Sequence, residues 1–258
     1  ISTMKPSVDF TRTLLYGEGL FETILWRGKT EKLMRHYRRL LSSARFFRIP
    51  CPSFEEFVRL IEEHTGGKRD LYVKFCLISE GDTRFDAFPE SFRTAVIVKP
   101  YRKIQKVRLT VSSFRRHSKD PLLYHKTMNY LFSVLVKRKA LSAGYDDAVI
   151  LNEMDEITEC SSSNIIFLKD DLLMTPSVQC GLLRGTTLEL LMERFDIKEV
   201  RAGIEELLEA DAVFVTNSIS GAVPVIEIMD TPIPVRYDLL EDLNRAIEED
   251  NTERDIKD

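Results

Sequence analysis

Cysteine and histidine are scarce in this sequence of 258 residues, which has four of each. The cysteines Cys51, Cys76, Cys160 and Cys180 form no CxxC pair, and no histidine stands near them at the spacing of a metal site. We therefore expect free thiols, a reducing compartment and no bound metal. Long apolar runs are also missing, since none approaches the roughly 18 residues that span a bilayer, and no charged and apolar leader opens the chain. These absences favour a cytoplasmic protein that does not bind a membrane.

A strong excess of one charge is absent too, because the formal net charge is −4 and the pI is near 5.8. This balance gives no general attraction to nucleic acid. Residues 99–119 gather eight Lys and Arg, but they lack the interleaved aromatic residues on which bases stack. A β-like segment, VRLTVSS at 107–113, lies in the middle of this stretch. We interpret the stretch as a solvated linker between two domains, with recruitment of a dianionic substrate as the alternative. The sequence therefore predicts no nucleic-acid partner.

Apolar periodicity predicts a chain of mixed helices and strands, with enough hydrophobic residues, 43%, for one large or two modest cores. In the first half it predicts helices over 32–47 and 54–64 and strands over 71–78 and 94–98. In the second half it predicts helices over 127–143, 186–195 and 239–249 and strands over 147–151, 165–168, 172–174, 213–216 and 225–229. We expect two domains, a small N-terminal α/β domain over residues 1–104 and a C-terminal α+β domain over residues 105–258.

Five short polar motifs follow one another along the chain in an order that suits a cofactor. They are RRLLSSA at 38–44, HKTMNY at 125–130, ITECSSSN at 157–164, GLLRG at 181–185 and VTNS at 215–218. A positively charged aromatic cofactor that bears a phosphate needs this assortment of acid, base and phosphate donors. With YGEGLFET at 16–23 and PVIEI at 224–228, the series resembles the class IV enzymes that use pyridoxal phosphate. This family holds branched-chain aminotransferases, D-amino acid aminotransferases and aminodeoxychorismate lyases.

The resemblance implies a two-domain, D-amino acid aminotransferase-like fold of type IV, with pyridoxal 5′-phosphate in the cleft between the domains. Lys126 matches the family's Schiff-base lysine, which also moves a proton on the substrate carbon. Its amine must be neutral for part of the cycle, which desolvation in a closed pocket favours. Glu159 matches the acid that pairs with the pyridine nitrogen. Arg39 matches the arginine whose planar fork binds the phosphate.

Further cofactor contacts are implied in the same way. The backbone amides of Leu182 and Leu183, in the turn before the helix that contains Thr186, match the family's second phosphate contact. Asn217 and Ser218 match the third contact or form an ordinary turn. Tyr130 lies four residues after Lys126, so on one helix it would share a face with the lysine and reach the ring oxygen of the cofactor, or else pack in the core. Family members are generally homodimers, and we expect a homodimer here.

The reaction depends on residues that face the substrate amine. The short chain with GLFET and HKTMNYL looks most like aminodeoxychorismate lyase, which releases pyruvate and 4-aminobenzoate in folate synthesis; Thr23 would then help to protonate the leaving group. The alternative is an aminotransferase that acts on branched-chain or D-amino acids with a 2-oxo acid acceptor. D-amino acid transaminases trap the substrate carboxylate with an arginine and a histidine, and here Arg84 is present but Asp86 stands in place of the histidine.

Two observations bear on the other possibilities. Glu80 occupies a position where several relatives have an arginine, and a carboxylate there would repel a substrate carboxylate unless it faces away. A different class of function, an inactive scaffold that serves as a binding protein, is disfavoured because Lys126, Glu159 and Arg39 are all retained.

Overall fold

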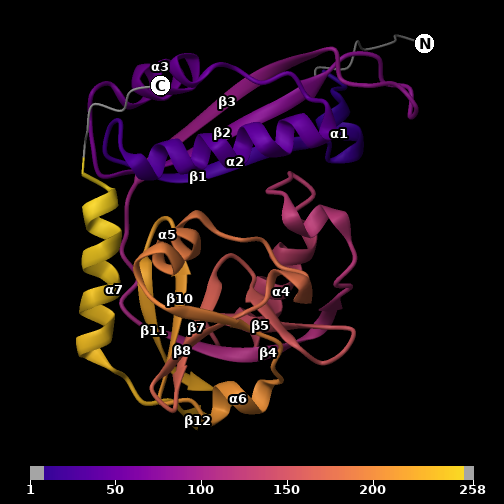
Figure 1. Ribbon diagram of the computed structural model, residues 1–258. Helices are drawn as coiled ribbons and strands as arrows, with labels where there is room; N and C mark the ends of the chain where they lie inside the picture. The colour runs from indigo at the N-terminus through magenta and orange to yellow at the C-terminus, as the bar shows by residue number, and fades with distance from the viewer. Residues whose placement is uncertain (1–8, 253–258) are drawn as a thin grey trace.

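The computed structural model describes residues 9–252, and within this range the strands form two sheets that are stacked one above the other in Figure 1. The elements of the upper part are α1 (Arg12–Tyr16), β1 (Gly19–Trp26), α2 (Glu31–Phe47), α3 (Phe54–Thr65), β2 (Leu71–Glu80) and β3 (Ser91–Pro100). The strands of the lower part are β4 (Val107–Arg116), β5 (Asp147–Asn152), β6 (Ile157–Cys160), β7 (Asn164–Lys169), β8 (Leu172–Pro176), β9 (Ile197–Val200), β10 (Ala212–Asn217), β11 (Gly221–Ile228) and β12 (Thr231–Pro232). Its helices are α4 (Leu131–Ser142), α5 (Thr186–Arg194), α6 (Ile204–Leu208) and α7 (Tyr237–Asp250), with 3-10 turns at Pro121–Tyr124 and Val178–Cys180.

The upper sheet is antiparallel in the order β1-β2-β3, and helices α2 and α3 pack against it. Both helices begin at a capping hydroxyl: Thr30 accepts the N–H of Leu33 at 3.1 Å, and Ser53 accepts the N–H of Glu56 at 3.2 Å. Their apolar faces meet the sheet in one buried cluster. The predicted helices over 32–47 and 54–64 and the predicted strands over 71–78 and 94–98 are confirmed.

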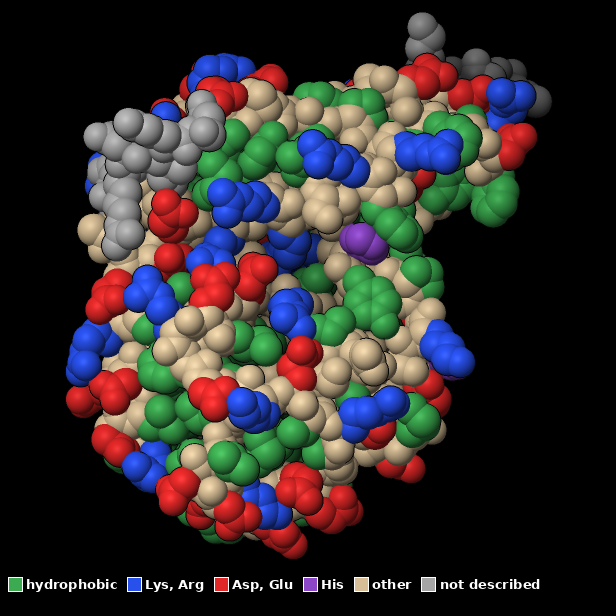
Figure 2. Space-filling view, in the orientation of Figure 1, with side chains coloured by type: hydrophobic (Ala, Val, Ile, Leu, Met, Phe, Trp, Pro, Cys, Tyr) green, Lys and Arg blue, Asp and Glu red, His purple; other side chains and the backbone are tan. Residues whose placement is uncertain are grey.

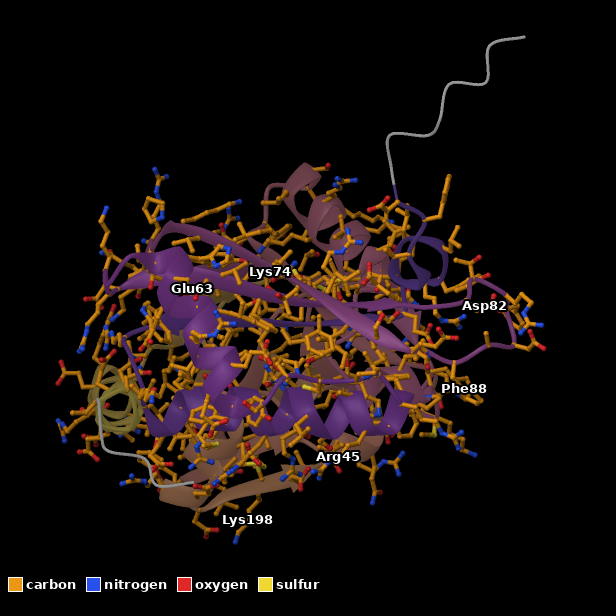
Figure 3. The ribbon with its side chains drawn as sticks, turned by 90° about the horizontal axis from the view of Figure 1, so that it is seen from above. Arg45, Glu63, Lys74, Asp82, Phe88 and Lys198 are labelled. Carbon is orange, nitrogen blue, oxygen red and sulfur yellow. The ribbon has the colours of Figure 1, made fainter. Side chains whose placement is uncertain are left out.

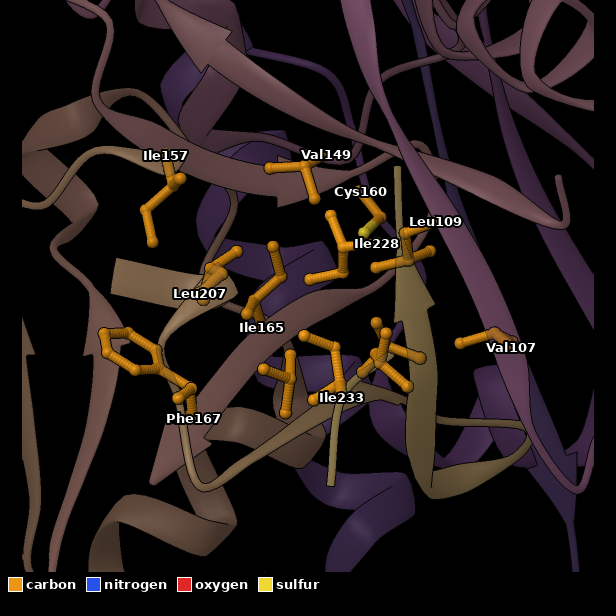
Figure 4. Close-up of a cluster of buried hydrophobic side chains, with 14 of the residues drawn as sticks. Val107, Leu109, Val149, Ile157, Cys160, Ile165, Phe167, Leu207, Ile228 and Ile233 are labelled. Carbon is orange, nitrogen blue, oxygen red and sulfur yellow. The ribbon is translucent and has the colours of Figure 1, made fainter. Parts of the chain in front are cut away.

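The lower sheet curls around a second core, and β4 lies inside it between β5 and β11. Figure 4 shows this core, in which Leu109 of β4 packs with residues of the neighbouring strands. Each such fully buried Leu, Ile or Phe contributes about 1.5–3 kcal/mol. The predicted β-like segment VRLTVSS, residues 107–113, is confirmed as part of β4, but the interpretation as a solvated linker is wrong for it because Val107 and Leu109 are buried. The charged residues of the strand have carboxylate partners, since Arg108 pairs with Glu227 and Arg116 pairs with Glu159.

The predicted helix over 127–143 is four residues too long at its start, because α4 begins at Leu131. The preceding chain is extended and pairs with β1: Phe21 donates its N–H to the Lys126 carbonyl at 3.0 Å, and Met128 donates to the Gly19 carbonyl at 2.8 Å. These sheet-like bonds replace the helical ones that the periodicity suggested. Lys126 and Tyr130 therefore do not share a helix face.

The other predicted elements of the second half are found within a few residues of their expected ends, as β5, β7, β8, α5, β10, β11 and α7. The sequence did not indicate β1, β6, β9, α1 or α6. Strand β1 is buried along nearly its whole length, so it shows no alternation of apolar and polar residues. The domain boundary between residues 104 and 105 stays a prediction.

Three features of residues 9–252 relate to the scarcity of cysteine and histidine and to the lack of long apolar runs in the sequence. All four cysteines lie within this range and are free thiols. Residues 9–252 contain no group of His, Cys, Asp and Glu arranged to hold a metal ion. In the same range no helix combines the length and the apolar character that crossing a membrane would need.

Candidate active site

A cavity of about 570 Å³ lies where the upper sheet meets the lower one. Its walls come from β1, α2 and β2 above, from β4 and the β6–β7 turn below, and from the segment of residues 117–133, the start of α5 and the turn after β10. On the face drawn in Figure 2, Lys and Arg side chains recur along the junction between the two parts. The site is thus assembled from segments that are far apart in the sequence.

Lys126 projects its amine into this cavity between two aromatic rings. Its Nζ lies 4.6 Å from the ring centre of Phe21 and 5.6 Å from that of Tyr130. Burial, reinforced by the guanidinium of Arg39, lowers the pKa of Lys126 to about 8, against the weaker opposing effects of Glu22 and Glu159. A substantial fraction of the amine is therefore neutral near pH 8, and a neutral amine can act as a nucleophile and as a base.

The segment that carries Lys126 is held on both sides. Its backbone pairs with β1, and the neighbouring His125 stacks on Phe46 of α2 with ring centres 4.3 Å apart. The Nδ1 atom of His125 also lies 3.0 Å from the hydroxyl of Ser43. These contacts fix the position of the lysine without involving its amine.

Glu159 forms one end of the cavity and is surrounded by hydrogen-bond donors. One of its oxygens pairs with the guanidinium of Arg116, the other accepts from Nδ2 of Asn164 at 3.2 Å, and the N–H of Leu183 also donates to the carboxylate. Burial raises the pKa of Glu159, and Arg116 acts in the opposite direction. Such a carboxylate can accept a further proton-bearing nitrogen from the cavity side.

The start of α5 also lines the cavity. Its N-cap is Gly185, which has no side chain to cap the open N–H groups of the first turn. The hydroxyl oxygens of Thr187 and Thr216 are buried there without a hydrogen-bond partner, and Thr186 shares a hydrogen bond of 3.0 Å with Ser218. Unsatisfied hydroxyls and open N–H groups beside the positive end of a helix dipole fit a phosphate group.

Arg39 also lines the cavity, and a buried acid from β1 holds it in place. Glu22 accepts from Arg39 Nε at 2.8 Å and from Arg39 Nη2 at 2.6 Å, and it accepts from Nδ1 of His36 at 2.6 Å. Burial alone would raise the pKa of Glu22, but Arg39 and His36 outweigh it and lower the pKa to about 2. Burial lowers the pKa of His36 to about 4, so this histidine is neutral at pH 7.

The structure places most of the predicted site residues around the one cavity. Those that line it are Thr23, Arg39, Lys126, Tyr130, Glu159, Leu183, Asn217 and Ser218. Tyr130 lies there although the helical argument for it fails, and its hydroxyl donates to the Ser161 carbonyl at 3.0 Å. Burial raises the pKa of Tyr130 to about 12. Their roles in binding or catalysis stay predictions.

Three expectations need correction. Leu182 does not line the cavity, and the N–H of Leu183 is bound to Glu159. The helix predicted from Thr186 is confirmed, and its own start, Gly185 to Thr187, lines the cavity in place of Leu182. Arg84 is not in the cavity: it lies in the β2–β3 loop, pairs with Asp82 at 2.8 Å, and its side chain is 74% exposed. Figure 3 shows Asp82 and Phe88 of this loop at the edge of the molecule.

Glu80 is turned away from the cavity. Its carboxylate pairs with Arg93 of the neighbouring strand at 2.6 Å. Glu80 therefore faces away from a substrate carboxylate in the cavity and does not repel it.

Sequence reasoning missed several residues of the site. Arg116 was counted as part of a linker, and the structural role of Asn164 at the end of SSSN was not considered. Thr186 and Thr187 directly follow GLLRG, and Thr216 lies within VTNS, so their positions beside predicted contacts were a usable signal. Lys74 of β2 carried no signal, because a lone lysine in a strand is usually solvated, yet it lines the cavity with its Nζ 4.1 Å from the ring centre of Phe21.

Comparison with known proteins agrees with this geometry. Residues 19–228 match the family model of amino-transferase class IV. A protein of Methanocaldococcus jannaschii named "Putative branched-chain-amino-acid aminotransferase" is 32% identical over 235 residues, which cover 85% of this chain and 81% of that protein. A structure from Legionella pneumophila, "Putative 4-amino-4-deoxychorismate lyase", superposes with a TM-score of 0.84 at 27% identity and covers 96% of this chain and 97% of that one.

A third relative was solved with a cofactor derivative bound. This branched-chain amino acid aminotransferase of T.th. origin, complexed with N-(5′-phosphopyridoxyl)-L-glutamate, has a TM-score of 0.78 and 25% identity and covers 93% of this chain and 85% of that one. The chain belongs to the class IV aminotransferase family. It is an enzyme with the type IV fold of that family, whose members include both aminotransferases and lyases.

Proposed function

We propose that this protein is a pyridoxal phosphate-dependent aminotransferase that transfers the amino group of a branched-chain amino acid to a 2-oxo acid. One observation carries the proposal. The buried amine of Lys126 lies in a cavity that is also lined by the carboxylate of Glu159 and by the start of helix α5, which has the features of a phosphate site. This is the set of partners that pyridoxal phosphate requires.

The residues present fit this cofactor. The N–H groups at the start of α5, the unsatisfied hydroxyls of Thr187 and Thr216, and Arg39 would hold its phosphate. Glu159 would accept the pyridine N–H, and Tyr130 would lie beside the ring. When bound, the cofactor supplies an aldehyde that reacts with amines and a ring that accepts electrons from the substrate carbon.

The residues of the chain would transfer protons and hold the groups around the cofactor in position. The neutral amine of Lys126 would remove the proton from Cα of the substrate. The same side chain would then donate a proton to the carbon that belonged to the aldehyde of the cofactor. Arg116, Asn164 and the Leu183 N–H hold Glu159 in place and favour its ionised form, which keeps a positive charge on the pyridine nitrogen. The rings of Phe21 and Tyr130 lie beside the amine.

The remaining walls suit a substrate with an aliphatic side chain and a carboxylate. Apolar surface comes from Phe21, Tyr72, Ile104 and Phe132, and positive charge comes from a group of basic side chains, namely Lys74, Arg102 and Arg115. The relatives named as branched-chain aminotransferases support this choice of substrate. A D-amino acid substrate is less well supported, since Arg84 lies outside the cavity and no histidine stands two residues after it.

The lyase is the second candidate, and two observations favour it. The basic side chains also suit the two carboxylates of 4-amino-4-deoxychorismate. Thr23 lines the cavity and is hydrogen-bonded to Tyr72, so its hydroxyl lies where it could serve a leaving group. The likeness to the Legionella structure supports the same reaction.

One set of assays separates the two. The protein, loaded with pyridoxal phosphate, is given L-leucine, L-isoleucine or L-valine with 2-oxoglutarate, and separately aminodeoxychorismate without any 2-oxo acid; D-leucine and the Lys126→Ala variant are the controls. We expect glutamate formation that depends on the L-amino acid and on Lys126. Release of pyruvate and 4-aminobenzoate without glutamate formation would replace the aminotransferase by the lyase. A protein that binds no cofactor would overturn both.

A further inference from the structure

Lys32, the second residue of α2, is buried although it does not line the cavity. Only 3% of its surface is exposed, and its Nζ donates to the carbonyl of Ser218 at 3.2 Å. Within residues 9–252 it forms no ion pair; Glu248 and Asp250 act on it only from a distance. Lysine is almost never fully buried without a paired acid, so this position calls for a compensating function.

The carbonyl that Lys32 binds belongs to the turn at the phosphate end of the cavity. Asn217 shapes this turn by accepting the N–H of Ile219 at 3.0 Å and of Ser220 at 2.8 Å. The hydroxyl of Ser218 meets that of Thr186 at the start of α5. Lys32 therefore ties α2 of the upper part to the turn and, through it, to the helix start of the lower part.

The charges around Arg39 show why a second cation is useful there. Glu22 takes two hydrogen bonds from Arg39, and His36 beside them is neutral, so this buried group has a net charge near zero. A phosphate carries up to two negative charges and would be weakly compensated by a guanidinium that an acid already neutralises. Burial lowers the pKa of Lys32 to about 8, so at pH 7 its amine still carries a positive charge, and no carboxylate in contact cancels this charge.

We propose that Lys32 is a positioning residue for the phosphate of the cofactor: it holds the Asn217–Ser220 turn against α5 and adds a buried positive charge behind the phosphate site. This inference rests on the proposed use of pyridoxal phosphate. It concerns binding of the phosphate and not the chemistry at Lys126, so binding and catalysis can be tested apart.

The test compares two ligands, pyridoxal phosphate and pyridoxal, which differ only in the phosphate. Dissociation constants are measured by absorbance titration for the wild type, Lys32→Met, Lys32→Gln and Lys32→Arg. Lys169→Met is the control, because Lys169 is a partly buried lysine that binds Glu206 and Glu209 away from the cavity. We expect Lys32→Met to weaken pyridoxal phosphate on the order of tenfold, as for loss of a charged hydrogen bond. Pyridoxal binding should be unchanged.

The remaining variants distinguish the effect of the positive charge of Lys32 from the effect of its hydrogen bond to the Ser218 carbonyl. Lys32→Arg should keep most of the preference for the phosphorylated ligand, and Lys32→Gln, which retains a donor but no charge, should lose part of it. If Lys32→Met does not fold, comparison of Lys32→Arg with Lys32→Gln still shows whether the positive charge contributes to the preference for pyridoxal phosphate over pyridoxal. Equal losses for both ligands, or no loss in any variant while the wild type binds pyridoxal phosphate, would overturn the role of Lys32. A wild type that binds neither ligand would overturn the proposed function as well.

Discussion

At the scale of single residues, the chemistry of Lys126 comes from its surroundings. A lysine at the surface has a pKa of about 10.4 and is almost fully charged at pH 7. In the cavity the amine lies beside the rings of Phe21 and Tyr130, where burial disfavours its charged form, and the nearby Arg39 disfavours a second positive charge. The residue type could be chosen from the HKTMNY motif, but the altered pKa depends on neighbours from β1 and α2.

Replacing Lys126 by alanine is expected to abolish the yellow colour of the protein after addition of pyridoxal phosphate. It should also lower the catalytic rate on the order of 10³-fold or more, because both the nucleophile and the base are lost. Absorbance spectra and steady-state assays measure the two effects. Lys119→Ala, at an exposed position, is the control and should behave as the wild type. A yellow, active Lys126→Ala protein would contradict the assignment.

The pKa of Lys126 predicts the pH dependence of cofactor loading. Only the neutral amine attacks the aldehyde, and the folded-state pKa of about 8 lies below the ordinary value of 10.5. The loading rate should therefore rise with pH, with its midpoint near pH 8, and level off above it. Stopped-flow absorbance of the cofactor-free protein across pH 6 to 10.5 measures this. A rate that keeps rising tenfold per pH unit up to pH 10 would show that the amine is not desolvated.

At the scale of elements, Asn164 at the start of β7 joins both ends of the cofactor site. Its Nδ2 donates to Glu159 and, at 2.8 Å, to the Leu183 carbonyl, while its Oδ1 accepts the N–H of Gly185 at 3.0 Å. The carboxylate of β6 and the start of α5 are thus set by one amide. This explains why the loop of residues 181–185 can end without a capping side chain.

Gly185 leaves no room for a side chain, and this gives a prediction for the element. A Cβ atom at Gly185 would collide with Oδ1 of Asn164, so Gly185→Ala should displace Asn164 and weaken cofactor binding on the order of tenfold or more. Gly203→Ala is a matched control, because Gly203 is the N-cap of α6 and its Cβ would closely meet only the flexible end of Glu205. Titration with pyridoxal phosphate and thermal melting compare the two. Equal affinities in both variants would contradict the proposed role of Asn164.

The helix predicted over 127–143 shows where element prediction fails. Its later part, residues 131–142, is helical as expected, whereas residues before Leu131 pair with β1. A partner strand more than a hundred residues away cannot be seen in a local pattern. Strand β1 was missed for a related reason, since burial along nearly its whole length removes the alternation.

At the scale of the whole molecule, ion pairs join the upper and lower parts beside the cavity. Arg35 of α2 pairs with Glu193 of α5 at 2.6 Å and with Asp250 of α7 at 3.2 Å. In Figure 1 helix α7 runs along the side of the lower part, and its end, which carries Asp250, approaches the upper part. These contacts hold α2, which carries Lys32 and Arg39, against the helix that starts the phosphate site.

The homodimer expected from the family stays a prediction, and an exposed apolar surface suggests where to test it. The members of this surface lie on and next to α1, at the end of α2 and in the β2–β3 loop, namely Phe10, Leu14, Leu15, Tyr16, Phe46, Phe85 and Phe88. Phe85 is 87% exposed, so Phe85→Asp should leave the fold intact and shift a dimer towards monomer. Sedimentation equilibrium measures this, with Leu172→Asp, at an exposed position on β8, as the control. A wild-type monomer would refute the expectation.

Local periodicity and motifs of fixed spacing were enough to predict the family and most of the helices and strands. The same motifs gave Lys126, Glu159 and Arg39 as candidate site residues. The folded structure was needed to place β4 inside the lower sheet, to show that the Leu183 N–H is bound to Glu159, and to show that Arg84 lies outside the cavity. It alone revealed Lys32, Asn164 and Arg116. Their contacts join segments that are distant in the chain, and a buried charge shows its partner only after the chain has folded.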